Sequence, residues 1–128
     1  MIDDINRKKM QRQKIKRNDQ FPSDLILRTV KHLHRNCRRA VQSHSIDNRT
    51  ASRLAMTRAL RCVQELIMFG DTGGDGEAVR RFFEGCTRME NALKYALSEE
   101  DIGYIEKEIL PQVNLMEESW RRICHNEL

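Results

Sequence analysis

The sequence predicts an all-α protein, an antiparallel four-helix bundle within a single domain. Apolar residues recur at steps of three and four in four separate segments, which is the periodicity of amphipathic helices. The chain has 128 residues but only 6 Gly and 2 Pro, fewer turn formers than a β-sandwich or an α/β fold usually needs. A chain of this length can bury its own core, and four amphipathic helices with short connections pack as a bundle.

The first helix is expected over about residues 22–43. Pro22 suits a first helical turn because its missing N–H is not needed there. Asp24 places negative charge near the positive end of the helix dipole. The apolar stripe that follows consists of Ile26, Leu27, Val30, Leu33, Cys37 and Val41. Much of the remaining surface carries arginine and lysine.

The second and third helices flank a glycine-rich stretch. Asp47 or Asn48 is expected to cap the second helix, which stops near residues 69–70. Residues 70–76 contain four glycines but lack the Lys-Ser/Thr of a phosphate-binding loop, and no strand precedes them. They therefore predict a helix–helix connection. The two apolar stripes are Ala55, Met56, Ala59, Leu60, Val63, Leu66 and Ile67, and then Val79, Phe82, Phe83, Cys86, Met89, Leu93 and Ala96 or Leu97.

The fourth helix is expected to begin at Ser98, which three acidic residues follow. Its apolar stripe is Ile102, Ile105, Ile109, Val113, Met116, Trp120 and Ile123. Pro111 lies inside this pattern, and an interior proline removes a backbone hydrogen bond. The helix is therefore either bent between Lys107 and Pro111 or split in two.

Residues 1–20 form a basic N-terminal arm, and residues 21–128 form the bundle domain. The arm holds seven Lys/Arg and three Asp, whereas the rest of the chain holds sixteen basic and sixteen acidic residues. We interpret the arm as a flexible extension. Alternatively, its few apolar residues, which include Met10 and Ile15, dock on the domain, or the arm binds nucleic acid. The last reading ranks lowest because the arm has no aromatic residue to stack on bases.

No residues in the sequence form a recognisable catalytic or metal-binding pattern. Four widely spaced cysteines and the lack of a signal peptide predict reduced thiols in a cytoplasmic protein. His32 and His34 are two residues apart and point to different sides of a helix. No apolar run is long enough to insert into a membrane. We therefore predict no enzyme, no catalytic residue, no metal and no cofactor.

Three stretches resemble the flagellar secretion chaperone family (FliS), in the same order and with similar spacing over about residues 21–124. Residues 22–27 are similar to the start of the family's first long helix, Ser-Pro-x-x-Leu-hydrophobic-Leu. Residues 73–79 are similar to its Gly-rich link into the third helix, and an aromatic pair follows at 82–83. Residues 109–120 are similar to the end of its last helix, which closes on a Trp. The chain departs in having no Tyr in the arm and TVKH at 29–32, where the family often has Leu-Tyr-Asp-Gly.

The resemblance implies an export chaperone that binds the C-terminal region of flagellin and keeps it unpolymerised before secretion. The departures leave another flagellar protein as the alternative client. In the family a short N-terminal segment can cover the binding surface, a role that Met10 and Ile15 would take here. We expect the client in apolar grooves between helices, although each candidate could instead be a core residue. The candidate contact residues are Leu27, Val30, Met56, Leu60, Val63, Phe83, Met89 and Met116.

Two other functions compete with the chaperone reading. A basic nucleic-acid-binding bundle would place the arm and the arginines of the first helix on phosphates, but residues 21–128 are neutral overall, which makes nucleic acid an unlikely partner. An enzyme built in the bundle core would need a cluster of titratable residues that the sequence does not provide. The sequence leaves open whether the bundle forms a homodimer.

Overall fold

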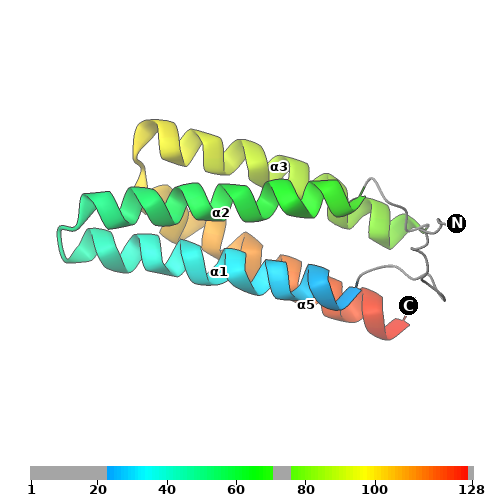
Figure 1. The fold of residues 1–128 in the computed structure, drawn as a ribbon. Coiled ribbons are helices and arrows are strands. Elements are labelled where there is room, and N and C mark those ends of the chain that lie inside the picture. The colour runs from blue at the N-terminus through cyan, green and yellow to red at the C-terminus, as the bar shows by residue number, and fades with distance from the viewer. Residues whose placement is uncertain (1–22, 71–75, 127–128) are drawn as a thin grey trace, which may run out of the picture.

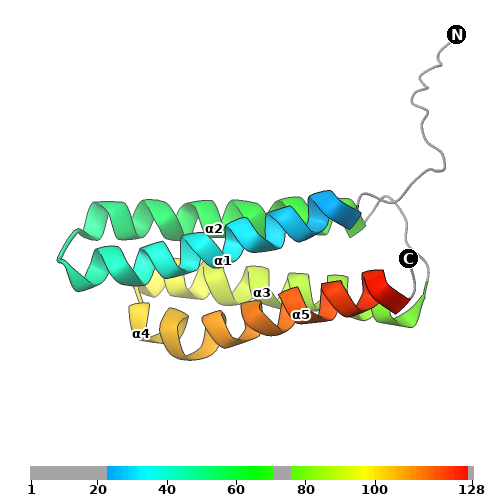
Figure 2. The ribbon, with the colours of Figure 1, turned by 90° about the horizontal axis from the view of Figure 1, so that it is seen from below.

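The computed structural model describes residues 23–70 and 76–126, and these residues form an antiparallel four-helix bundle as predicted (Figure 1). The predicted arm, residues 1–20, lies outside this range. Helices α1 and α2 form one layer, and α3 and α5 form a second layer beneath it (Figure 2). The elements in chain order are α1 (Ser23–Ser45), α2 (Arg49–Gly70), α3 (Glu77–Glu99), α4 (Ile102–Tyr104), the π-helical turn η1 (Ile105–Ile109) and α5 (Leu110–Asn126).

Both ends of α2 have a local cause. The side-chain oxygen of Asn48 accepts a hydrogen bond from the amide of Ala51 at 3.0 Å, so Asn48 caps the helix. At the other end, a Cβ on Gly70 would lie 2.9 Å from the ring of Phe83. Only glycine lets the end of α2 approach α3 this closely.

The predicted start of the last helix at Ser98 is wrong, because α3 continues through Ser98 to Glu99. Glu100 then adopts a left-handed conformation (φ 51°), and the carbonyl of Ala96 accepts the amides of both Glu100 and Asp101. The carboxylate of Asp101 accepts a hydrogen bond from the amide of Tyr104 at 3.0 Å. Asp101 is therefore the residue that caps the last helix.

Pro111 neither splits the last helix nor ends it. The helix continues from Ile102 to Asn126 through η1, where the amide of Leu110 bonds to the carbonyl of Ile105, five residues back. In a regular α-helix the ring of Pro111 would collide with the carbonyl of Lys107. The wider π-turn relieves that collision, so the predicted distortion takes this form.

Two kinds of contact hold the bundle together. The α1–α2 seam contains the buried small residues Ala40, Ser52, Ala55 and Ala59, and the hydroxyl of Ser52 donates to the carbonyl of Ala40 at 2.8 Å. At the opposite end of the molecule, the ring of Phe82 packs on fully buried Trp120 with centroids 4.8 Å apart. The indole N–H of Trp120 donates to the carbonyl of Ser23 at 3.0 Å, which ties α5 to the first turn of α1.

Candidate partner-binding groove

A groove of about 600 Å³ lies between α3 and the last helix, and we call it the α3–α5 groove. Its lining runs from Ala78 to Ala92 on α3, which is about 20 Å of helix. The apolar residues that line it are Phe82, Met89, Ile109, Met116 and Ile123, with Leu115 at the exposed edge. An apolar floor of this length fits a peptide helix better than a compact small molecule.

The α3 wall of the groove is built from small residues. Ala78, Gly85 and Ala92 recur every seven positions, so they lie on the same side of α3, two turns apart. A Cβ on Gly85 would meet nothing nearer than Arg88 Nη2 at 3.6 Å, an ordinary contact. Packing within the described residues therefore does not require glycine there, although glycine costs a helix interior about 0.5–1 kcal/mol relative to alanine. Close approach of another backbone would account for it.

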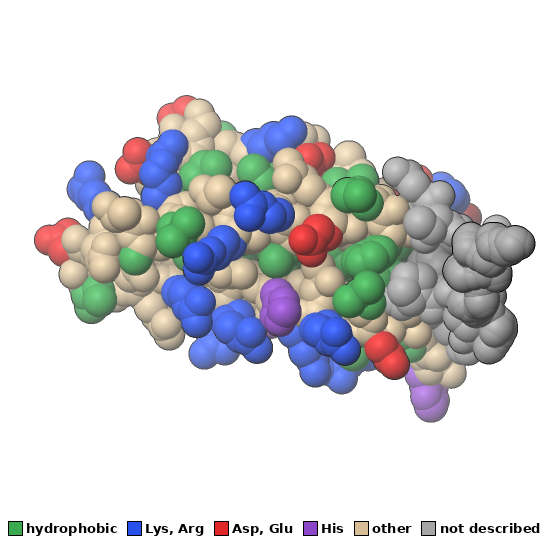
Figure 3. Space-filling model, viewed as in Figure 1, with side chains coloured by type: hydrophobic (Ala, Val, Ile, Leu, Met, Phe, Trp, Pro, Cys, Tyr) green, Lys and Arg blue, Asp and Glu red, His purple; other side chains and the backbone are tan. Residues whose placement is uncertain are grey.

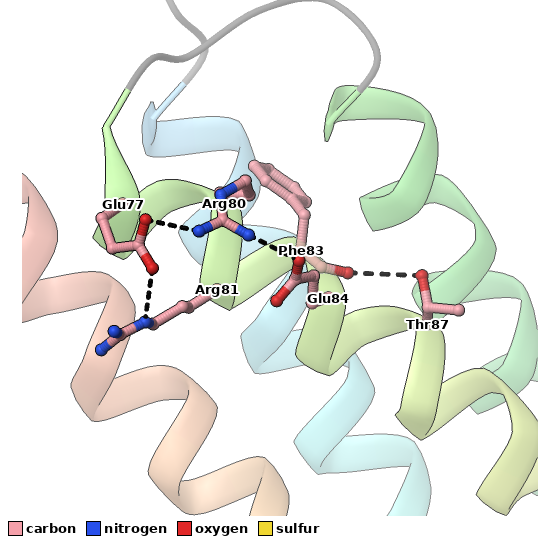
Figure 4. Close-up of polar contacts among 6 residues, drawn as sticks. All are labelled: Glu77, Arg80, Arg81, Phe83, Glu84 and Thr87. Atoms are coloured by element: carbon pink, nitrogen blue, oxygen red, sulfur yellow. Dashed lines mark hydrogen bonds and ion pairs between the residues drawn. The ribbon is translucent and has the colours of Figure 1, made fainter.

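Arg81, at one end of the groove, is neutralised by its own helix. Its Nε donates to Glu77 at 3.0 Å, and Glu77 also binds Arg80, which bonds to Glu84 at 2.8 Å (Figure 4). The hydrogen bond and positive charge of Arg80, with a smaller effect of Arg81, hold the pKa of Glu77 below its usual value. The network also neutralises charge in the first turns of α3.

Two other cations line the groove without such partners. Arg88 projects from α3 and Arg122 from α5, both are exposed, and neither forms an ion pair with another described residue. The acidic lining residue Glu108 lies on η1, fourteen residues before Arg122 and so about 20 Å away along the helix. The charge of the groove therefore changes sign along its length.

The structure separates the predicted contact residues of the bundle into three groups. Met89 and Met116 line the groove, whereas Leu27, Leu60 and Phe83 are half-buried, pack against the core and do not line it. The others are at most 3% exposed and do not line the groove, so a client could reach them only if the helices separated; they are Val30, Met56 and Val63. Met89 is itself only 5% exposed at the base of the groove, whereas Met116 is half-buried. Met10 and Ile15 lie outside the described residues.

Several groove residues escaped the sequence analysis. The small residues at 78, 85 and 92 and the cations at 88 and 122 were not proposed as contacts. One signal was present in the sequence: Gly85 interrupts a strong helical pattern, and such a glycine calls for a reason in packing or function.

The cysteines show no sign of thiolate chemistry. Burial raises the pKa of the Cys86 thiol to about 12 and, with the charge of Cys62, that of Cys37 to about 12. Burial is also the main reason why the pKa values of Cys62 and Cys124 are raised. A reactive thiol would show the opposite shift.

The part of the chain described here holds no cluster of three or more His, Cys, Asp or Glu side chains that could bind a metal ion. Within the same residues, no helix is both long and apolar enough to cross a membrane. Comparisons with protein-family models, with curated proteins and with solved structures found no match to this chain.

Proposed function

We propose that the protein is an export chaperone that binds an amphipathic helical segment of an unfolded client in the α3–α5 groove. The observation that carries the proposal is a groove between two long helices, lined by apolar side chains at its base and by both polar and apolar groups where it meets solvent. Met89 and Met116 suit such a floor because the flexible methionine side chain adapts to differently shaped partners. Helix-in-groove recognition needs no chemistry beyond apolar burial and a few flanking polar contacts.

The proposed client is the C-terminal region of flagellin or another flagellar protein, held in the cytoplasm before secretion. This assignment rests on the resemblance of residues 22–27, 73–79 and 109–120 to flagellar secretion chaperones. The same resemblance is the basis for a role of Met10 and Ile15 in covering the surface when the client is absent. That role stays a prediction.

The test is titration calorimetry with a C-terminal flagellin peptide from the same organism, using wild type and Gly85→Leu. Leucine at 85 would fill the groove from a position where a Cβ meets no backbone. We expect wild-type affinity of roughly micromolar or tighter, with a negative heat-capacity change from apolar burial, and at least about tenfold weaker binding by the variant.

Asn91→Leu is the matched control, because it adds the same side chain to an exposed position of α3 that does not line the groove. It should bind like wild type. Equal binding by Gly85→Leu would rule out the groove as the site. No binding by wild type would remove flagellin as the client.

Nucleic-acid binding is the second candidate function, and the outward face of α1 is the observation that favours it. Five exposed cations of α1 form no ion pair with another described residue, and basic side chains gather over this helix in Figure 3. They are Arg28, Lys31, Arg35, Arg38 and Arg39. Binding to phosphates would weaken steeply with salt, whereas mainly apolar binding in the groove would weaken only slightly, so the slope of a salt titration separates the two functions.

A further inference from the structure

Two cations of the groove, Arg88 and Arg122, form no ion pair with another described residue, although acidic residues lie near both in sequence. Glu84 lies one turn before Arg88 on α3, but it is bonded to Arg80 at 2.8 Å. On α5, Glu117 is bonded to Arg121 at 2.7 Å and lies 3.8 Å from His34, and the exposed Glu118, one turn before Arg122, forms no ion pair with it. One unpaired guanidinium is thus left on each wall of the same apolar groove.

The position of Arg88 suits a carboxylate that arrives with a partner. One of its terminal nitrogens lies 3.6 Å from the place of a Cβ on Gly85, so the guanidinium lies back along the small-residue wall. A guanidinium is only weakly hydrated and offers a planar fork of donors to a carboxylate. An acidic residue beside the apolar stripe of a bound helix would meet it there.

The charge of the groove also discriminates between occupants. The arm carries seven Lys/Arg and three Asp, the same sign as Arg88 and Arg122, so charge makes the arm a weaker occupant than an acidic helix, which would displace it. Two copies of the chain that met groove to groove in parallel across a two-fold axis would bring these same cations together, whereas an antiparallel pair would set Arg122 toward Glu108 of the second copy. An acidic partner helix meets neither penalty.

We infer that the α3–α5 groove selects an amphipathic helix with acidic side chains beside its apolar stripe, placed to pair with Arg88 and Arg122. The inference rests on the proposed function and specifies the partner for it. Glu108 at the far end adds a direction, because the acidic part of the helix must lie toward Arg122.

The test uses two fluorescein-labelled synthetic helices with the same leucine stripe, one flanked by Glu and the other by Lys. Binding is measured by fluorescence anisotropy at low and high salt. The Glu-flanked helix gains two exposed ion pairs and the Lys-flanked helix meets two repulsions, so we expect wild type to prefer the Glu-flanked helix roughly tenfold at low salt. The double variant Arg88→Glu/Arg122→Glu should reverse the preference.

Arg35→Glu/Arg39→Glu is the matched control, since it changes the net charge equally on the outer face of α1. It should keep the wild-type preference. Equal binding of both helices by wild type, or a preference for Lys, would overturn the inference while leaving the groove as a site, provided that Gly85→Leu abolishes binding. Binding that survives Gly85→Leu, or no binding of either helix, would overturn the proposed function itself.

Discussion

The two long helix pairs of the bundle use small residues in opposite ways. In the α1–α2 seam, Ala40, Ala55 and Ala59 are at most 2% exposed, and the Ser52 hydroxyl of α2 donates to the backbone carbonyl of Ala40 on α1. On α3, by contrast, the small residues at 78, 85 and 92 are half-buried and border a groove.

The two sets of small residues differ in whether the facing helix covers them. The facing helix covers the small residues of the seam. Across α3, the Phe82–Trp120 pair fixes one end, while the π-turn distorts the last helix at the other end. Gly85 and Ala92 lie between these two points, and residues this small leave a hollow. A small-residue stripe thus marks close packing in one half of the molecule and an open groove in the other.

The largest expected effect is at the residue that holds the open side together. Trp120→Ala should lower the free energy of unfolding by about 3–5 kcal/mol, because it removes a fully buried aromatic side chain. Trp120→Phe keeps the aromatic contact but loses the hydrogen bond to Ser23, so its cost should be smaller. Urea unfolding followed by circular dichroism measures both, and equal losses would contradict the packing account.

Enlarging one small residue on each side tests the comparison directly. Ala59→Leu should cost about 1–3 kcal/mol because the α1–α2 seam has no room for it. Ala92→Leu points into the groove and should change stability by less than about 1 kcal/mol. Urea midpoints of the two variants give the answer, and similar losses would mean that the groove is as tightly packed as the seam.

The two glycines near α3 should respond with opposite signs. Gly85→Ala should raise the free energy of unfolding by about 0.5–1 kcal/mol, because alanine favours the helix and its Cβ has space. Gly70→Ala should lower it, since the new Cβ would lie 2.9 Å from the ring of Phe83. Thermal unfolding resolves the sign, and stabilisation by both would show that α2 and α3 have room at this end.

The buried and part-buried thiols should differ in reactivity only at alkaline pH. Because burial raises the native pKa of Cys37 and Cys86 to about 12 from 9.0, folding favours their protonated forms. This stabilisation is complete below pH 9 and is lost as the pH rises toward 12. Iodoacetamide at pH 9 should therefore modify part-buried Cys62 and Cys124 first, as mass spectrometry can show. Early modification of Cys37 would contradict the burial argument.

The bundle could be predicted from the sequence because periodicity identifies the stripe of each helix, and residues at the stripe centres, such as Val30 and Val63, are buried. The groove could not be predicted in this way, because periodicity does not give the distance between two helices. The prediction of where the last helix begins failed for a local reason. Ser98 and Asp101 carry equivalent capping signals, and the left-handed turn at Glu100 decides between them.

Methionine methyl resonances give the most direct test that the α3–α5 groove is the binding surface. Met89 and Met116 line the groove, whereas Met56 is buried in the core and Met68 is exposed on α2. With the protein labelled at methionine methyl carbons and titrated with the client peptide, the account predicts shifts at Met89 and Met116 and none at Met56 or Met68. A shift at Met68 with Met89 and Met116 unchanged would place the client elsewhere and contradict the account.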